Sequence, residues 1–292
     1  MPVDHEIDSR NENIQIYING SFYHRDEAKI SVYDSGFLMG DGIWEGLRLV
    51  NNKWIFIDEH IDRLFEGCMA IDLDIKMTKE DIVNALNETK AINNMSNEVH
   101  ARLMITRGNK SKPFQQPHLS ESGINIVIIM EHSKPSIDVK NITMVTVPQV
   151  RGMPMSQDPK LNSHSKLNCI LACIQANKLG ADEALMLDPL GFVNTTNSCN
   201  FFIVKNNQVW TSTGDYCMNG VTRQNIINLC KENDIPIYEK NFSLVDVYSS
   251  DEAFITGTLG SLTNVISIDN RKIGIDSNPV TDILRKYYKK LL

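Results

Sequence analysis

The sequence lacks several features that would assign it to a simple class. Its 292 residues contain no apolar run of the roughly 18 residues that a membrane span requires. Positive charge is not in surplus, because 29 Lys and Arg stand against 36 Asp and Glu, and a nucleic-acid partner is therefore not expected. The segment Met1–Arg10 is polar and lacks the basic and apolar parts of a secretory signal. We expect a cytoplasmic protein with neither membrane nor nucleic acid as a partner.

Cysteine is too sparse and too scattered for a disulfide framework. The six cysteines are Cys68, Cys169, Cys173, Cys199, Cys217 and Cys230. None forms a CxxC pair, and their spacing matches no zinc ligand set. In a reducing compartment they are expected to be thiols, and no metal site is predicted.

The apolar content of 42% is sufficient for a substantial core, and its patterning is mixed. Asn19-Gly20 between alternating apolar residues predicts a hairpin over 14–23, and residues 46–57 around Asn51-Asn52 predict another. Helical spacing follows from Ile61 to Met69. Thr78, with Asp81 three residues later, predicts the start of a helix that ends near Ala91.

The remaining pattern alternates strands and helices without internal repeats. Strands are expected at 99–106, 123–130, 142–147, 183–187, 200–205, 208–212, 236–239 and 252–256, and helices at 167–179, 222–233 and 278–291. A polar linker is expected at 131–136. This predicts an α+β protein with a smaller domain over 1–132 and a larger domain over 139–292.

Two segments have the composition of anion-binding loops. Gly220-Val221-Thr222 stands where a helix begins, so its free amides and the helix dipole favour a phosphate. Thr256-Gly257-Thr258 follows a strand and offers amides and hydroxyls. Either segment alone would be an ordinary capped helix or turn, but both lie in the same predicted domain.

The sequence resembles the class IV, or fold-type IV, pyridoxal-phosphate-dependent aminotransferases across nearly its whole length. The matching blocks, in order, are Tyr33–Gly42, Trp44–Arg48, His60–Leu64, Gly180–Ala184, Gly220–Arg223 and Thr256–Thr258. The family contains branched-chain and D-amino acid aminotransferases and aminodeoxychorismate lyase. The resemblance implies a D-amino acid aminotransferase-like fold, a homodimer, and amino transfer between a small amino acid and a 2-oxo acid.

The resemblance also assigns roles to individual residues. It implies that the cofactor phosphate is bound by Arg63 and the two loops, through Gly220, Val221, Thr222, Gly257 and Thr258. A bidentate guanidinium and oriented N–H donors suit a dianionic phosphate. Arg102 resembles an arginine in the substrate pocket of branched-chain enzymes, and Arg107 matches a more widely shared position. A substrate carboxylate is the expected partner of both.

Two positions depart from the family pattern. Counting without a gap from Asp158-Pro159-Lys160, Asn162 occupies the position of the lysine that carries the cofactor. Thr195 occupies the position of the glutamate that pairs with the pyridine nitrogen. A carboxamide cannot form a Schiff base, and a neutral hydroxyl cannot supply a negative charge.

Three explanations remain open for these departures. Lys166 could replace the lysine, since four residues make about one turn, or ~6 Å, if the segment is helical. Alternatively, Asn162, His164 and Lys166 perform different chemistry on a phosphate ester that is not covalently held. In the third, the protein is a binding or regulatory subunit. The polar residues of Ser163–Lys166 and the two intact loops favour a rebuilt site, and we predict an aminotransferase-like enzyme.

Overall fold

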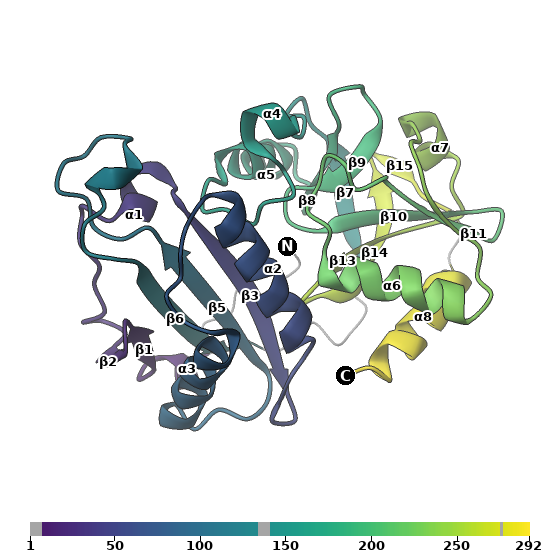
Figure 1. The fold of residues 1–292 in the computed structure, drawn as a ribbon. Helices are drawn as coiled ribbons and strands as arrows, with labels where there is room; N and C mark the ends of the chain where they lie inside the picture. The colour runs from purple at the N-terminus through teal and green to yellow at the C-terminus, as the bar shows by residue number, and fades with distance from the viewer. Residues whose placement is uncertain (1–7, 134–140, 275–276) are drawn as a thin grey trace. The chain divides into compact units, whose positions relative to one another are not determined.

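The computed structural model describes residues 8–133, 141–274 and 277–292, which divide into two compact units (Figure 1). The N-terminal unit contains the described residues up to 133 together with Leu161–Lys166. The C-terminal unit contains residues 141–160 and those from 167 onward. The predicted domain start at residue 139 lies outside the described residues. The chain thus crosses back to the N-terminal unit for six residues, which a linear division does not anticipate.

The N-terminal unit is an antiparallel sheet covered on one face by helices. Its elements are η1 (Ser9–Asn11), β1 (Gln15–Ile18), β2 (Ser21–His24), α1 (Ser35–Met39), β3 (Gly42–Val50), β4 (Lys53–Trp54), α2 (Ile57–Ala70), α3 (Lys79–Ile92), β5 (Val99–Thr106), η2 (Pro117–Leu119) and β6 (Asn125–His132). The sheet order is β2-β1-β6-β5-β3-β4. Helix α2 packs on β3, and α3 packs on β1 and β6.

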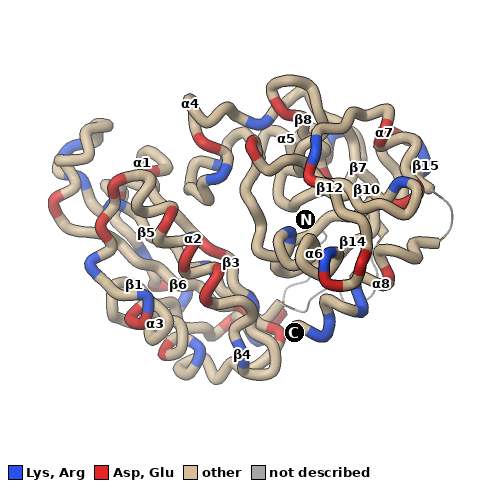
Figure 2. Tube along the Cα trace, turned by 45° about the vertical axis from the view of Figure 1, so that its right-hand side comes forward, with Lys and Arg blue, Asp and Glu red and all other residues tan. Residues whose placement is uncertain are grey.

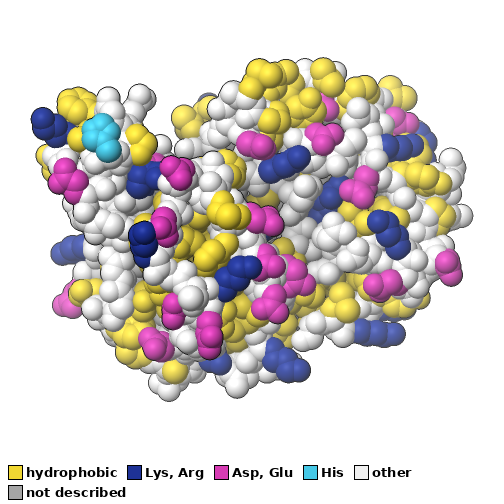
Figure 3. Space-filling model, in the orientation of Figure 1, with side chains coloured by type: hydrophobic (Ala, Val, Ile, Leu, Met, Phe, Trp, Pro, Cys, Tyr) yellow, Lys and Arg dark blue, Asp and Glu magenta, His cyan; other side chains and the backbone are white. Residues whose placement is uncertain are grey.

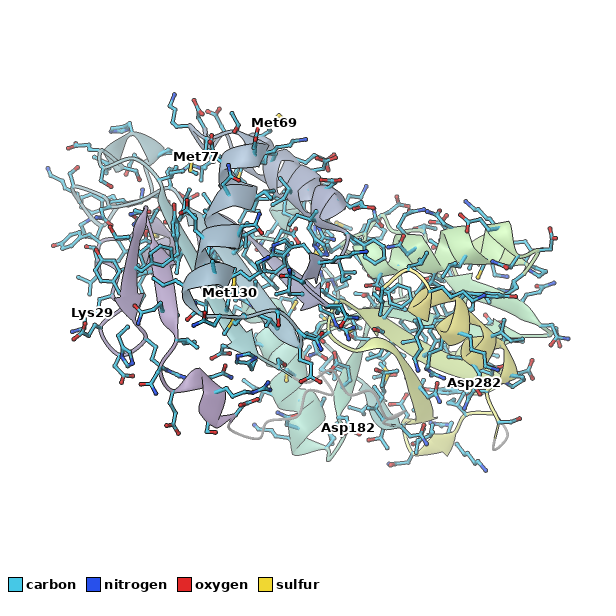
Figure 4. The ribbon with its side chains drawn as sticks, turned by 90° about the horizontal axis from the view of Figure 1, so that it is seen from below. Lys29, Met69, Met77, Met130, Asp182 and Asp282 are labelled. Carbon is cyan, nitrogen blue, oxygen red and sulfur yellow. The ribbon has the colours of Figure 1, made fainter. Side chains whose placement is uncertain are left out.

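Successive side chains along each strand point to opposite faces of this sheet. On β5, the side chains of Val99, Ala101, Leu103 and Ile105 are buried in the core. On β6, Met130 belongs to the same core and lies beside α3 in Figure 4. The intervening β5 residues, which include Arg102, are only partly buried on the opposite face. That opposite face is the one that can offer polar groups to a ligand.

A buried carboxylate attaches α2 to β3. Glu45 of β3 is fully buried and accepts hydrogen bonds from Arg63 Nε at 2.8 Å and Arg63 Nη2 at 2.7 Å. His60 Nδ1 lies 2.8 Å from the same carboxylate. Burial alone would raise the pKa of Glu45, but the charge of Arg63 and the hydrogen bond with His60 lower it below its ordinary value of 4.5. Glu45 is therefore ionised and paired in the folded protein.

The C-terminal unit is built on a mixed sheet. Its elements are β7 (Ile142–Thr146), α4 (Pro154–Gln157), α5 (Leu167–Lys178), β8 (Glu183–Leu187), β9 (Val193–Thr196), β10 (Asn200–Lys205), β11 (Gln208–Thr211), α6 (Val221–Glu232), β12 (Ile237–Glu239), α7 (Leu244–Tyr248), β13 (Glu252–Gly257), β14 (Ser261–Ile268), β15 (Arg271–Lys272) and α8 (Pro279–Lys289). The order is β12-β11-β10-β13-β14-β7-β8-β9, with β15 on β14, and β9 also pairs with β10. Helix α5 packs on β7 and β8, and α6 and α8 pack on β13.

Most of the predicted elements are confirmed, but two expectations are wrong and some elements were not anticipated. The strand expected at 53–57 ends at Trp54 because α2 begins at Ile57, with Asp58 and Glu59 favouring a helix N-terminus. The linker expected from 131 is partly strand, since β6 continues to His132 in register with Val99 of β5. Strands β9 and β14 were not anticipated. The rest of that linker, from 134, lies outside the described residues.

Basic and acidic residues alternate along the described Cα trace of both units in Figure 2, with no long run of one sign. Among the described residues, no helix is both long enough and apolar enough to span a membrane. The same residues contain no group of three His, Cys, Asp or Glu side chains placed to hold a metal ion.

We predict that Glu45→Gln lowers the free energy of unfolding by about 3 kcal/mol, because it leaves Arg63 and His60 without their buried anion. Urea denaturation followed by circular dichroism measures this. The folded pKa lies below the unfolded one, so the carboxylate's contribution is complete above pH 4.5 and is lost as the pH falls through the folded value. The difference in the free energy of unfolding between wild type and Glu45→Gln should therefore become smaller in acid.

Asp62→Asn is the matched control, because Asp62 lies on α2 next to Arg63 and forms an exposed ion pair with Lys79 of α3. Its expected cost is about 0.5 kcal/mol. Equal effects of the two substitutions would show that Glu45 does not attach α2 to the sheet.

Candidate functional site

The first anion-binding loop of the C-terminal unit leads directly into α6. The helix begins at Val221, and Gly220 is its N-cap in an extended conformation without a side-chain cap. The amides of Val221 and Thr222 therefore open the helix with no acceptor inside it. The Gly220 amide already donates to Asn200 Oδ1 at 3.2 Å, and a Cβ at Gly220 would collide with that oxygen. The loop is held tightly while its next two amides stay available for an anion.

Asn200 brings the second loop next to the first. On β10, it pairs with Thr256 of β13 and Thr195 of β9, and its Nδ2 donates to Met218 O at 2.9 Å. Strand β13 ends at Gly257, and Thr258 follows in the turn before β14. The Thr256 hydroxyl is buried without a hydrogen-bond partner among the described residues. Both predicted loops thus border one asparagine that sequence reasoning did not single out, since nothing local marks it.

Thr195 is buried in β9, and its hydroxyl donates to Cys199 O at 2.7 Å. This bond uses the hydroxyl proton within the protein. A neutral group that is already engaged supplies no charge to a ligand.

Arg63 belongs to the N-terminal unit and is held by Glu45 through Nε and Nη2. Two of its three guanidinium nitrogens are therefore committed to a buried carboxylate. Its role as a phosphate ligand stays a prediction.

The segment around Asn162 lies along β3 as a short extended partner. Asn162 O accepts from Trp44 N at 3.0 Å, and His164 N donates to Gly42 O at 2.9 Å. Ser163 pairs with Ile43 between these two bonds. The residues 162–164 are therefore paired with a strand, and α5 begins only at Leu167. The condition under which Lys166 would stand one helical turn after Asn162 is not met, because the segment before Leu167 is not helical.

The side chain of Asn162 adds to this pairing. It is 4% exposed, and its Nδ2 donates to Trp44 O at 2.7 Å. The Trp44 indole Nε1 in turn donates to Ser163 O at 3.1 Å. Asn162 Oδ1 is buried without a partner among the described residues. Residues 162 and 163 therefore hold Trp44 at its amide, its carbonyl and its ring.

Two cations lie over the Trp44 ring, and we call Trp44, Arg102 and Lys166 the Trp44 platform. The guanidinium carbon of Arg102 is 3.7 Å from a Trp44 ring centroid, and Lys166 Nζ is 5.6 Å away. Such cation–π contacts favour a fixed orientation of the cation. Arg102 has no carboxylate partner among the described residues, and burial lowers its pKa below the ordinary value of a guanidinium. A partly buried guanidinium without an anion is a receptor for a carboxylate.

Two histidines beside Arg102 are shifted toward the neutral form. Burial, followed by repulsion from Arg102, lowers the pKa of His100 to about 4. Burial and Arg102 also lower the pKa of His164, whose Nε2 has no partner among the described residues. His164 lines a largely apolar cavity of about 470 Å³ together with Met104 and Ile129. This face of the sheet combines the Arg102 cation with neutral imidazoles and apolar walls.

Arg107 is already saturated within the protein. It bonds Asp41 at 2.8 and 3.1 Å and also donates to the carbonyls of Asp72 and Ile71. Burial alone would raise the pKa of Asp41, but hydrogen bonds from Arg107 and Ser35 lower it. The geometry is that of a structural ion pair, and substrate binding by Arg107 stays a prediction.

Comparison with known proteins places these features in a family. The family model for class IV aminotransferases matches residues 42–268. "Branched-chain-amino-acid aminotransferase-like protein 2" of Arabidopsis thaliana is 36% identical over 283 residues, covering 96% of this chain and 51% of that protein. The chain thus spans about half the length of that relative. A D-alanine aminotransferase of Listeria monocytogenes is 30% identical over 285 residues, covering 94% of this chain and 95% of that protein.

A solved structure agrees with this placement. A branched-chain aminotransferase from the thermophilic archaeon Thermoproteus uzoniensis, solved with norvaline, superimposes with a TM-score of 0.86 at 25% identity. The match covers 96% of this chain and 95% of that one. With an α+β fold of this kind and a family model that matches residues 42–268, the chain belongs to the class IV aminotransferase family.

Proposed function

We propose that this protein binds pyridoxal phosphate, or a phosphate ester of the same class, and transfers an amino group between a small amino acid and a 2-oxo acid. The observation that carries the proposal is the pair of loops around Asn200. They offer the amides of Val221 and Thr222 without intrahelical acceptors, next to the strand end at Gly257 and Thr258. Free amides at a helix start, beside a hydroxyl, fit a phosphate.

The phosphate ligands in this proposal are those amides and the Thr258 hydroxyl. When bound, pyridoxal phosphate supplies a ring that withdraws electrons from the substrate α-carbon. Another branched-chain amino acid aminotransferase of this fold was solved in complex with N-(5′-phosphopyridoxyl)-L-glutamate, which supports a ligand of this class.

Arg102 binds the substrate carboxylate in this proposal. It is supported by the partial burial of the guanidinium, its stacking on Trp44 and the lack of a carboxylate partner among the described residues. A carboxylate would restore the missing charge pair, and the apolar cavity beside His164 leaves room for an aliphatic side chain.

Lys166 supplies the amine for covalent attachment in this proposal. By sequence register Asn162 takes the position of the family's lysine, and a carboxamide cannot bond covalently to an aldehyde carbon. Lys166 is the lysine whose Nζ lies over Trp44, beside Arg102. An amine there could reach a ligand held by the same platform.

A second candidate is a protein that retains the phosphate ester without covalent attachment and performs other chemistry. It is favoured by the engagement of Asn162 with the Trp44 backbone and of Thr195 with Cys199 O. Neither group is available for the roles that a lysine and a glutamate would fill. The two candidates differ in whether a lysine becomes labelled.

We further propose a cytoplasmic homodimer. Helix α5 packs inward through Ala172 and Ala176, whereas large aliphatic residues face outward at helical spacing. These are Leu167, Ile170, Leu171 and Ile174, exposed by 66%, 52%, 44% and 44%. Hydrophobic side chains gather over α4 and α5 in Figure 3. An apolar stripe of this kind is self-complementary across a twofold axis.

The six unpaired cysteines suit a reducing compartment.

We predict that Thr258→Val weakens pyridoxal phosphate binding about tenfold, because it removes a hydroxyl that donates to a charged phosphate. Thr258→Ser keeps the hydroxyl and should bind within about twofold of wild type. Equilibrium dialysis with pyridoxal phosphate measures both constants. A valine variant that binds as tightly as the serine variant would exclude Thr258 from the site.

Reduction with borohydride in the presence of pyridoxal phosphate should attach the pyridoxyl group to Lys166. Peptide mass mapping locates the label, which Lys166→Ala should abolish. Lys160→Ala is the matched control, since Lys160 is exposed two residues before Asn162, and its variant should retain the label. Label on Lys160 would assign the amine there instead, and the absence of any site-specific label would leave the second candidate.

The wild type should sediment as a dimer, and Ile170→Lys should shift it toward monomer, because a charge would be buried in the apolar contact. Analytical ultracentrifugation at micromolar concentration tests this. Val245→Lys, on the exposed face of α7, is the control and should leave the dimer intact. A wild type that remains monomeric would refute the proposed dimer.

A further inference from the structure

Asn162, which takes the position of the family's lysine by sequence register, is bonded to Trp44, the residue that supports Arg102. Asn162 contacts Trp44 through its backbone oxygen, at 3.0 Å from Trp44 N, and through its carboxamide, at 2.7 Å from Trp44 O. A lysine side chain has no short, planar amide group with which to make the second bond. The hydrogen bond from the side chain of residue 162 to Trp44 O is therefore specific to asparagine.

The orientation of Trp44 determines where Arg102 points. The guanidinium lies 3.7 Å from the ring centroid, and burial removes much of the water that could otherwise orient it. Because no carboxylate partner holds Arg102 among the described residues, the ring is the contact that fixes its plane.

We propose that Asn162 is a positioning residue, which holds Trp44 and through it orients the Arg102 guanidinium to receive the carboxylate of an amino acid or 2-oxo acid. The inference rests on the proposed role of Arg102 in the proposed function. It assigns Asn162 a purpose in place of covalent chemistry. A bidentate guanidinium–carboxylate contact depends strongly on the plane of the guanidinium, so a modest tilt should weaken it.

The burial of Asn162 supports this role over that of an inert spacer. The side chain is 4% exposed, and a neutral carboxamide can be buried at much lower cost than a cation. Its neighbour Ser163 accepts the indole N–H of the same tryptophan. Three polar atoms of Trp44 are therefore bound by two consecutive residues.

The test uses full-length protein and a carboxylate that undergoes no reaction. 4-Methylvaleric acid is the probe, because it carries neither an amino nor an oxo group, and isothermal titration calorimetry measures its affinity. Asn162→Ala should weaken this binding about fivefold, the effect of losing one orienting hydrogen bond. The uncharged analogue 4-methylpentanamide should bind wild type and variant equally, since it does not depend on the guanidinium. A loss for both ligands would indicate general damage and overturn the positioning role.

Two further variants distinguish positioning from simple destabilisation. Ser165→Ala removes the bond from Ser165 Oγ to Gly40 O in the same segment and should leave probe affinity unchanged. In an Arg102→Gln background, Asn162→Ala should have no further effect on 4-methylvaleric acid, because both changes remove the same interaction. Additive losses, equal affinity of wild type and Asn162→Ala, or no binding to wild type would each overturn the inference.

The outcome is separable from that of the cofactor proposal. If the protein does not bind pyridoxal phosphate, but Asn162→Ala still weakens the binding of 4-methylvaleric acid, only the proposed amino transfer is rejected. Amino transfer that persists while Asn162→Ala leaves probe affinity unchanged would reject the positioning role alone.

Discussion

The pairing of residues 162–164 with Gly42–Trp44 of β3 is the constraint on which the Trp44 platform depends. It joins positions about 120 residues apart in the sequence through backbone bonds, the Asn162 carboxamide and the Trp44 indole. The pairing keeps this segment extended until α5 begins at Leu167. It therefore fixes the tryptophan on which Arg102 and Lys166 lie.

An analogous constraint operates in the C-terminal unit. Asn200 bonds the Gly220 amide, and its own strand pairs with β13 and β9. One amide side chain thereby sets the start of α6 against the strand that ends at Gly257. The asparagines have comparable roles in the two units: each uses a short carboxamide to attach a loop to a strand. Neither contributes charge, so the cation of the platform and the free amides of the helix remain available for anions.

The sequence predicted local structure well where the local signals were strong. Strands β5, β8 and β10 begin and end where the alternating or continuous apolar runs do, and Thr78 caps α3 with Asp81 as expected. Strand β14 was missed because it follows a Gly- and Thr-rich turn whose composition suggests a loop. The non-helical path before α5 could not be read locally, since it results from pairing with β3.

In the candidate site, too, local sequence signals identified residues but not their tertiary partners. Motif matching identified Arg63 and Arg107, but their carboxylate partners Glu45 and Asp41 stand 18 and 66 residues away, and no local pattern indicates such pairs. The aromatic support of Arg102 was equally hidden, because Trp44 lies on the neighbouring strand β3. Residue type and spacing can suggest a charged group's chemistry, whereas its partners are decided by tertiary contacts.

The proposed function depends on a phosphate held by the loops around Asn200. Calorimetric titrations of the wild-type protein with pyridoxal phosphate and with pyridoxal, which lacks the phosphate, test this dependence. We expect saturable binding of pyridoxal phosphate and an affinity for pyridoxal at least about a hundredfold weaker, since several charge-assisted hydrogen bonds would be lost. Equal affinities, or no binding of pyridoxal phosphate, would contradict it.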